Sequence, residues 1–346
     1  MRLRILIAAG GTGGHLFPAQ QLCELLLKEG DCDLFFAGYK LQDSPFFKRE
    51  KIPFQEIASA PVKEIFPFLK AVWKGFWQSV ALIRRFKPDV VVGFGSYHSF
   101  PLLLAAALLR KKMVLFEANC ILGKVNRLFI PAAEKIACQF PIENRKSVLV
   151  PFLPWMKRRA WEAEEARQAY GLNVSRFTIL VFGGSQGAAF LNREFPKAAA
   201  LLQQKGYDFQ VVHFTGIGGK AEYSSSAAVK EFEKEMPQAY AAADLVVCRS
   251  GAGTMAELIR FQKPALLIPY PYAAEDHQKI NGQFLAQKIG GGRLLIQSEA
   301  SAEKMAEELE ILWKEKANYV EALRKALLHE PAKIDFGALI KSVGKR

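Results

Sequence analysis

The chain has 346 residues and a formal net charge of +13; 50% of its residues are hydrophobic and 23% are charged. This length predicts two domains, and the large apolar share excludes a disordered chain. The basic excess favours an anionic partner such as nucleic acid, an acidic membrane surface or a phosphorylated substrate.

The first half of the chain alternates short apolar runs with helical patterns. Buried parallel strands are predicted at 3–9, 34–37, 90–93 and 113–117. Alternating strands and helices are typical of an α/β domain with a parallel sheet. We expect residues 1–150 to form an N-terminal Rossmann-like domain.

A glycine-rich turn, GGTGGHLFPA at 10–19, follows the first predicted strand. It lacks the last glycine of the dinucleotide fingerprint and the Gly-Lys-Ser/Thr of a P-loop. Glycines at such a turn still let backbone N–H groups approach an anion, and the following helix adds partial positive charge. The alternative is a tight turn that only packs the helix closely on the strand.

Residues 64–87 form a long apolar stretch interrupted by basic residues. On a helix, its aromatic side chains share one stripe and two lysines lie on the flank. These residues are Phe66, Trp73, Phe76 and Trp77, with Lys70 and Lys74. Tryptophan and phenylalanine beside lysine are typical of an interfacial helix on anionic lipid. A core helix packed on the sheet is the alternative, and Gly75 would weaken an isolated helix.

The alternation of strands and helices begins again after a candidate linker, PFLPWMKRR at 151–159. Strands are predicted at 177–182, 209–214, 245–248, 265–268 and 293–296. One long helix is predicted over 301–328. We expect residues 151–329 to form a second Rossmann-like domain, with 330–346 packing back on the first.

Two further glycine loops follow strands of the second half. GGSQGA (183–188) repeats the plan of the first loop, which favours anion binding over simple packing at both. SGAGTMAEL (250–258) matches the relaxed pattern G-x-G-x-x-A, and Glu257 stands where a carboxylate accepts both hydroxyls of a ribose. A first-turn glutamate favoured by the helix dipole is the alternative.

Polar side chains gather after the strand predicted at 265–268. They are Glu275, Asp276, His277, Gln278 and Asn281. Amides and carboxylates at the carboxyl end of a parallel strand suit the recognition of sugar hydroxyls. A polar helix cap is the alternative.

Six motifs stand in the order, and at roughly the spacing, of one known family. They are GGTGGHLFPA, GFGSYHS (93–99), EANCILGKVN (117–126), GGSQGA, CRSGAGTMAEL (248–258) and DHQKIN (276–281). Together they resemble the MurG family of peptidoglycan N-acetylglucosaminyltransferases over nearly the whole chain. The resemblance implies the GT-B fold, with two Rossmann-like parallel-sheet domains facing a central cleft.

The resemblance also implies the reaction. It is the inverting, metal-independent transfer of GlcNAc from UDP-GlcNAc to the 4-hydroxyl of undecaprenyl-diphospho-MurNAc-pentapeptide, which converts lipid I to lipid II. The residues implied on the donor side are Ser185 and Gln186 at the diphosphate, Ala252, Gly253, Thr254, Met255 and Glu257 at the uridine and ribose, and Gln278 at the GlcNAc hydroxyls. Those implied on the acceptor side are Thr12, Gly13, Gly14, His15 and Asn119.

His15 is the candidate general base. It stands at a helix start, where the positive end of the helix dipole favours the neutral imidazole. Inverting transfer needs a base for the acceptor hydroxyl and stabilisation of the leaving diphosphate, for which helix N-termini and glycine loops are suited. The alternative is that His15 hydrogen-bonds the diphosphate or the acceptor while a carboxylate acts as the base.

Metal, disulfide and membrane-spanning motifs are not indicated. The five cysteines are odd in number and lack CxxC spacing, which predicts a reducing compartment. Asp31-Cys32-Asp33 matches the D-x-D pattern of metal-dependent glycosyltransferases, but it precedes a strand, so we interpret it as a turn. No stretch reaches the roughly 20 apolar residues of a membrane span. We expect no cofactor, and a cytosolic protein that attaches peripherally to the cytoplasmic face of the cell membrane.

Other functions fit parts of the pattern. A lipid-directed transferase such as a diacylglycerol glycosyltransferase shares the fold and the loops, and a non-catalytic nucleotide-sugar binder shares the donor site. Only the net charge favours the interpretation as a nucleic-acid-binding protein. The basic residues interleave with apolar stripes, which does not support that interpretation. The presence of both His15 and Glu257 favours an enzyme over a non-catalytic binder. We expect no nucleic-acid partner.

Overall fold

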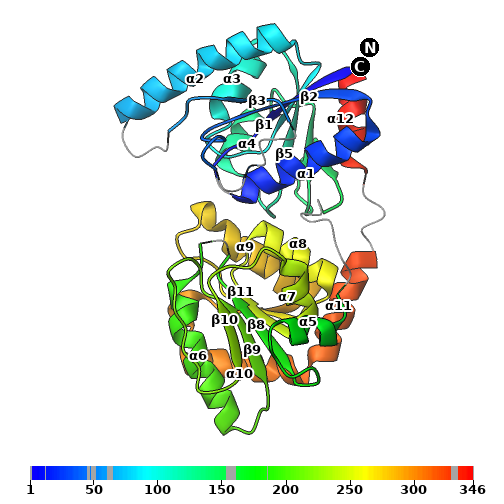
Figure 1. The fold of residues 1–346 in the computed structure, drawn as a ribbon. Helices are drawn as coiled ribbons and strands as arrows, with labels where there is room; N and C mark the ends of the chain where they lie inside the picture. Colours follow the sequence, from blue (N-terminus) through cyan, green and yellow to red (C-terminus); the bar gives the residue numbers. More distant parts are fainter. Residues whose placement is uncertain are drawn as a thin grey trace. The chain divides into compact units, whose positions relative to one another are not determined.

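The computed structural model describes residues 2–11, 13–44, 47, 52–60, 65–152, 161–184, 186–328 and 334–345. The chain divides into two compact units (Figure 1). Unit 1 comprises Met1–Met156 and Pro331–Arg346, and unit 2 comprises Lys157–Glu330. Most of the predicted linker at 151–159 lies outside the described residues. Each unit has one parallel sheet, which confirms the predicted fold class of two Rossmann-like domains.

The sheet of unit 1 has seven strands in the order β3-β2-β1-β4-β5-β6-β7. They are β1 (Leu3–Ala8), β2 (Cys32–Gly38), β3 (Phe54–Glu56), β4 (Val90–Gly93), β5 (Lys112–Glu117), β6 (Lys135–Cys138) and β7 (Ser147–Leu149). Strand addition changes direction between β1 and β4. Open α/β sheets bind ligands at such a switch point, outside the carboxyl ends of the strands.

Helices cover both faces of this sheet and create two cores. Ile5 and Ile7 of β1 pack with α1 (Gly13–Glu29) and α12 (Phe336–Lys345), whereas Leu6 and Ala8 pack with α2 (Ile65–Phe86), α3 (Phe100–Leu108) and α4 (Lys124–Phe129). Successive side chains of a strand point to opposite faces. A strand buried on both faces therefore reads as a continuous apolar run, which is why β1 was predictable.

The last helix, α12, belongs to unit 1 and lies beside α1 (Figure 1). Phe336 stacks on Phe116 of β5 with ring centroids 5.4 Å apart. Lys341 pairs with Glu29 and Asp31. The first aspartate of the D-x-D segment is thus engaged in an ion pair. The part of the chain that the structure describes contains no group of three or more His, Cys, Asp or Glu able to hold a metal ion.

The apolar stripe predicted on α2 divides along the helix. Val80 and Ile83 are buried in the core, so the core-helix interpretation holds for the C-terminal half. Phe66 and Trp73 are 80% and 63% exposed. At Gly75 a β-carbon would lie 2.0 Å from the Ala58 carbonyl oxygen, so the glycine lets the helix pack closely there. None of the described helices is long and apolar enough to cross a bilayer.

The sheet of unit 2 has six strands in the order β10-β9-β8-β11-β12-β13. They are β8 (Thr178–Phe182), β9 (Gln210–Phe214), β10 (Ala227–Lys230), β11 (Leu245–Cys248), β12 (Ala265–Leu267) and β13 (Gly292–Leu294). The helices are α5 (Ala163–Ala169), α6 (Ala189–Gln204), α7 (Met236–Ala242), α8 (Ala252–Phe261), α9 (His277–Gln283), α10 (Ala302–Lys314) and α11 (Lys316–Leu328). The switch point of this sheet lies between β8 and β11.

The single helix predicted over 301–328 is wrong. The structure has two helices, α10 and α11, which meet at Glu315. α10 packs on α6 and α11 packs on α8, so the break gives each helix its own partner. Neither glycine nor proline stands at the break, and the local sequence therefore gives no signal for it.

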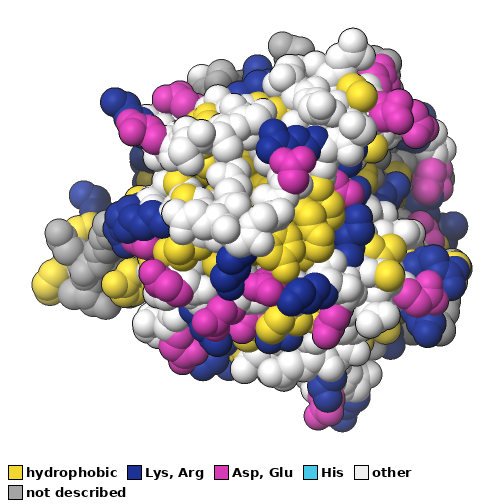
Figure 2. All heavy atoms as spheres, turned by 90° about the horizontal axis from the view of Figure 1, so that it is seen from below, with side chains coloured by type: hydrophobic (Ala, Val, Ile, Leu, Met, Phe, Trp, Pro, Cys, Tyr) yellow, Lys and Arg dark blue, Asp and Glu magenta, His cyan; other side chains and the backbone are white. Residues whose placement is uncertain are grey.

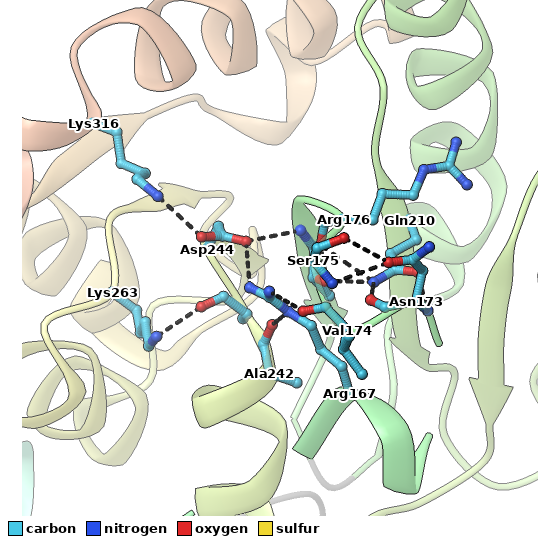
Figure 3. A network of polar contacts seen from close by, with 12 residues as sticks. Arg167, Asn173, Val174, Ser175, Arg176, Gln210, Ala242, Asp244, Lys263 and Lys316 are labelled. Atoms are coloured by element: carbon cyan, nitrogen blue, oxygen red, sulfur yellow. Dashed lines mark hydrogen bonds and ion pairs between the residues drawn. The ribbon is translucent and has the colours of Figure 1, made fainter. Parts of the chain in front are cut away.

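Charged side chains join the elements at the amino edge of the unit 2 sheet, where β8 and β11 begin (Figure 3). Asp244 accepts hydrogen bonds from the Arg167 guanidinium at 2.8 Å, the Thr178 N–H at 2.9 Å and Lys316 Nζ at 3.0 Å. Arg167 also donates to the Ala242 carbonyl oxygen at 3.0 Å. Because ligands bind at the opposite edge, we assign this network to stability.

Asp244→Ala is expected to lower the free energy of unfolding of unit 2 by about 2 kcal/mol or more, because two half-buried cations lose their counter-charge. Urea denaturation measures the change. Asp208→Ala is the matched control: Asp208 pairs with Arg176, but its side chain is 76% exposed, so its loss is expected to cost less than about 1 kcal/mol. Equal effects of the two substitutions would contradict the assignment.

Candidate functional site

The first glycine loop leaves β1 at the switch point of unit 1. Gly11 has φ +91°, and a β-carbon there would lie 2.6 Å from Cδ2 of His98. A β-carbon on Gly10 would lie 2.9 Å from the Tyr39 nitrogen. These glycines are therefore required for close packing against the segments that follow β2 and β4.

His15 lies in the first turn of α1, where its side chain is half-buried. Gly13 is buried and Gly14 is exposed beside it, while Thr12 lies outside the described residues. A helix N-terminus at the carboxyl edge of a parallel sheet presents N–H groups and partial positive charge. Three of the predicted acceptor-side residues thus lie together in the first turn of α1.

A second histidine, His98, lies behind this loop and was not predicted as a site residue. Its ring stacks on Tyr39 with centroids 4.6 Å apart and lies 4.1 Å from the Tyr97 ring. Burial, with the nearby charges of His15 and Lys40, lowers the pKa of His98 to about 4. The ring is therefore neutral at physiological pH. His98 follows β4 at the switch point of the sheet, and this position was the signal by which the sequence could have identified it as a site residue.

Glu117 ends β5 and anchors the loop that carries Asn119. Its Oε1 accepts hydrogen bonds from the Asn119 N–H at 3.1 Å and from Asn119 Nδ2 at 2.9 Å. Its Oε2 accepts from the Gly123 N–H and from Asn126 Nδ2, both at 2.9 Å. An ionised carboxylate has about four acceptor positions, and four donors fill them. We infer that Glu117 is a scaffold for Asn119 and is not free to accept a substrate proton.

The GGSQGA loop joins β8 to α6 at the switch point of unit 2. At Gly187, φ is +73° and a β-carbon would lie 2.2 Å from the Thr215 carbonyl oxygen, so this loop packs against the segment after β9. Asn192 Nδ2 donates to the same oxygen at 2.9 Å. Gln186 is exposed, and Ser185 lies outside the described residues.

α8 begins directly after the turn that follows β11. Its N-cap, Gly251, supplies no side-chain hydrogen bond. The first-turn N–H groups therefore point to the carboxyl edge of the sheet without a capping side chain. Ala252, Gly253 and Thr254 are at least partly accessible there, whereas Met255 is fully buried.

Glu257 lies on α8 and is half-buried. Its Oε2 accepts a hydrogen bond from the Tyr240 hydroxyl at 2.8 Å. The Tyr240 ring is fully buried and stacks on Phe261 with centroids 4.8 Å apart. A rigid phenol thus orients the carboxylate, and an oriented carboxylate is the group that accepts two ribose hydroxyls.

Gln278 lies in the first turn of α9. Its Oε1 accepts from the Tyr270 N–H at 2.9 Å, and its backbone oxygen accepts from Ser250 Oγ at 2.7 Å. Because Oε1 is engaged, the side-chain amide offers its N–H donors to a ligand. Glu275 and Asp276, which directly precede α9, have φ values of +55° and +53°. Such strained backbone is typical of ligand-binding segments.

Arg249 stabilises this edge of the sheet, although it was not among the predicted site residues of its motif. The side chain is buried, and it donates to the carbonyl oxygens of Ile268 and Pro269 at 3.0 and 2.9 Å and to Gln297 Oε1 at 2.7 Å. Burial lowers the pKa of Arg249 from its usual value. Its guanidinium connects the end of β11 to the segment that leads to Tyr270 and Gln278.

Two family models match this chain. The glycosyltransferase family 28 N-terminal domain matches residues 5–138, and the glycosyltransferase family 28 C-terminal domain matches residues 178–335. The chain belongs to glycosyltransferase family 28. Its two units carry the two family 28 domains, and all three glycine loops fall within the matched ranges.

Two relatives of this family 28 chain carry the same name. The protein of Protochlamydia amoebophila is 39% identical over 332 residues, which are 90% of this chain and 88% of that protein. It is named UDP-N-acetylglucosamine--N-acetylmuramyl-(pentapeptide) pyrophosphoryl-undecaprenol N-acetylglucosamine transferase. A Chlamydia felis protein of the same name is 35% identical and covers 93% of both chains.

Solved structures of glycosyltransferases share the fold. The crystal structure of Acinetobacter baumannii MurG matches with a TM-score of 0.75 at 25% identity over 100% of both chains. A kitacinnamycin glycosyltransferase matches with a TM-score of 0.75 at 14% identity, which shows the fold alone. The resemblance of this family 28 chain to the MurG family is confirmed.

Proposed function

We propose that this chain transfers GlcNAc from UDP-GlcNAc to the 4-hydroxyl of undecaprenyl-diphospho-MurNAc-pentapeptide, with inversion at the anomeric carbon. This is the conversion of lipid I to lipid II in peptidoglycan synthesis. The observation that carries the proposal is the 39% identity, over 90% of this chain, to a relative named for this reaction.

Unit 2 binds the donor in this proposal. The oriented Glu257 carboxylate accepts the ribose hydroxyls, and the Gln278 amide donates to the GlcNAc hydroxyls. The N-terminus of α8 holds the uridine side through Ala252, Gly253, Thr254 and the backbone around Met255. The loop with Ser185 and Gln186 surrounds the diphosphate, whose negative charge the helix N-termini stabilise.

His15 is the proposed general base of unit 1. The acceptor O4–H gives its proton to the imidazole, O4 bonds to the anomeric carbon, and the bond from that carbon to the diphosphate oxygen breaks. UDP leaves with the electron pair. Backbone N–H groups of the 183–188 loop and of the α8 N-terminus, both in unit 2, stabilise its charge. The Glu117 carboxylate accepts four hydrogen bonds within unit 1, which supports the choice of His15 over Glu117 as the base.

The exposed face of α2 between Phe66 and Trp77 is the proposed membrane contact. Trp73 and Trp77 are exposed, and their ring centroids are 5.6 Å apart. Phe76, 5.3 Å from Trp77, is partly buried and packs against the core of unit 1, so of the predicted aromatic residues it is the least available to lipid. Lys70 and Lys74 are exposed on the same helix. Aromatic rings that enter the lipid interface, with lysines on anionic headgroups, fit a peripheral protein at the cytoplasmic face.

Replacement of Trp73 and Trp77 together by Ser is expected to weaken binding to anionic vesicles about tenfold or more, because two large apolar surfaces no longer enter the lipid. Vesicle sedimentation measures the binding. Tyr272→Ser is the control, since Tyr272 is 81% exposed but lies in unit 2. A folded double variant that sediments like the wild type would place the membrane surface elsewhere.

Nucleic acid is not among the proposed partners. On the face drawn in Figure 2, Lys and Arg side chains are interspersed with Asp and Glu. Ion pairs on α10 and α11 include Lys304–Glu307, Lys314–Glu310 and Arg324–Glu321. Basic side chains paired in this way do not form the single-sign track that binds phosphates.

The identity of the product tests the proposal. UDP-GlcNAc, UDP-GalNAc and UDP-glucose are each supplied with the lipid-linked acceptor, and the product is analysed by mass spectrometry and by the anomeric coupling constant in NMR. We expect one GlcNAc in β linkage to O4 of MurNAc, and faster transfer from UDP-GlcNAc than from the other donors. An α linkage, or attachment elsewhere, would refute the proposed chemistry.

A further inference from the structure

His213 is a fully buried histidine with no part in the proposed mechanism. It lies on β9 among apolar residues and is 0% exposed. Burial lowers the pKa of His213 to about 4, so its ring is neutral at physiological pH. A neutral imidazole has one donor and one acceptor nitrogen, and both require partners in a buried site.

The neighbours of His213 determine which nitrogen carries the proton. Asn192 Nδ2 donates to the Thr215 carbonyl oxygen at 2.9 Å, because that oxygen can only accept. Asn192 therefore presents Oδ1 to His213 Nε2 at 3.1 Å, and Nε2 must be the donor. Nδ1 is then the acceptor for the Tyr223 hydroxyl, 2.6 Å away. The three hydrogen bonds from Tyr223 to His213, from His213 to Asn192 and from Asn192 to the Thr215 oxygen therefore each have one permitted direction.

The chain of hydrogen bonds ends where two glycine loops touch. A β-carbon on Gly187 would lie 2.2 Å from the Thr215 carbonyl oxygen, and one on Gly216 would lie 2.6 Å from the Gly187 α-carbon. The segment after β9 is thus in backbone contact with the 183–188 loop. Asn192, close after that loop on α6, fastens the segment through the Thr215 oxygen.

We propose that His213 is a positioning residue that acts through Asn192 to fix the 183–188 loop for the diphosphate of a nucleotide sugar. The inference rests on the proposed role of that loop. Without the Nε2 donor, the Asn192 amide is free to rotate by 180°, which would turn Oδ1 toward the Thr215 carbonyl oxygen. Two acceptors would then face each other, and the contact that holds the loop would be lost.

Calorimetric titration of UDP into the full chain tests the inference without an acceptor. His213→Leu is expected to raise the Kd for UDP about tenfold, because Asn192 loses its donor. Tyr223→Phe removes only the hydroxyl that donates to Nδ1 and should change the Kd less than threefold. His213→Gln supplies an amide N–H on the side of Nε2 and should recover most of the affinity. In steady-state assays, KM for UDP-GlcNAc should rise while KM for the acceptor stays unchanged.

A cooperatively folded His213→Leu protein with the Kd of the wild type would overturn the inference. If that variant does not fold, Asn192→Ala provides the same test, because it removes the link between His213 and Thr215; an unchanged Kd would again overturn it. A wild-type protein that does not bind UDP would instead refute the proposed donor site, whatever the variants do.

Discussion

His15→Ala is expected to lower kcat by about 100-fold or more, which is the usual loss when a general base is removed. The KM for UDP-GlcNAc should stay within about threefold of the wild-type value, because His15 lies in unit 1 and the proposed donor contacts lie in unit 2. A fall in kcat without a change in donor KM identifies an interaction made in the transition state.

His15→Gln separates the two roles that the sequence leaves open for this residue. Glutamine can hydrogen-bond the diphosphate or the acceptor, but it cannot accept a proton at neutral pH. If His15 is the base, Gln and Ala reduce kcat to a similar extent, and the acid limb of the pH–rate profile changes in both. Activity of the Gln variant near the wild-type level would show that His15 only hydrogen-bonds and that another group takes the proton.

Glu117→Gln is expected to lower the free energy of unfolding of unit 1 by about 3 kcal/mol and to reduce activity strongly. The carboxylate accepts from four donors on Asn119, Gly123 and Asn126. A glutamine NH2 placed on either side faces two of these donors, and each buried donor left unpaired costs about 1–3 kcal/mol. The loop with Asn119 then loses its anchor, although the substitution changes only one atom.

Urea denaturation and hydrogen exchange at residues 118–123 measure this effect. Glu134→Gln is the matched control, because Glu134 is exposed and should change stability by less than about 0.5 kcal/mol. If Glu117→Gln unfolds at the wild-type urea concentration with protection at 118–123 unchanged, Glu117 does not anchor this loop.

The long buried strands and their loops were predictable because each is local in sequence. β1 and β8 are apolar runs followed by glycines, and both lead into helices at switch points. Strands β3, β6, β7 and β10 were not predicted. β3, β7 and β10 contain no buried residue, so no continuous apolar run marks them in the sequence. They form because a neighbouring strand offers unpaired backbone groups, which a sequence pattern does not display.

The buried polar residues of the site were hidden for a similar reason. His213 is linked to Asn192 and Tyr223 by tertiary contacts between β9, α6 and the loop after β9. Arg249 reaches Gln297 across 48 positions. His15 in the first turn of α1 and Glu257 in the second turn of α8, in contrast, each follow a glycine loop after a predicted strand, where local pattern and chemistry coincide.

UDP release with three acceptor conditions tests the central claim most directly: the undecaprenyl-linked MurNAc-pentapeptide, diacylglycerol, and no acceptor. We predict rapid UDP release from UDP-GlcNAc only with the muramyl lipid, and loss of that release in His15→Ala. Equal release with diacylglycerol would indicate a different lipid-directed transferase. UDP binding without release under any of the three conditions would contradict the assignment of this chain as a transferase.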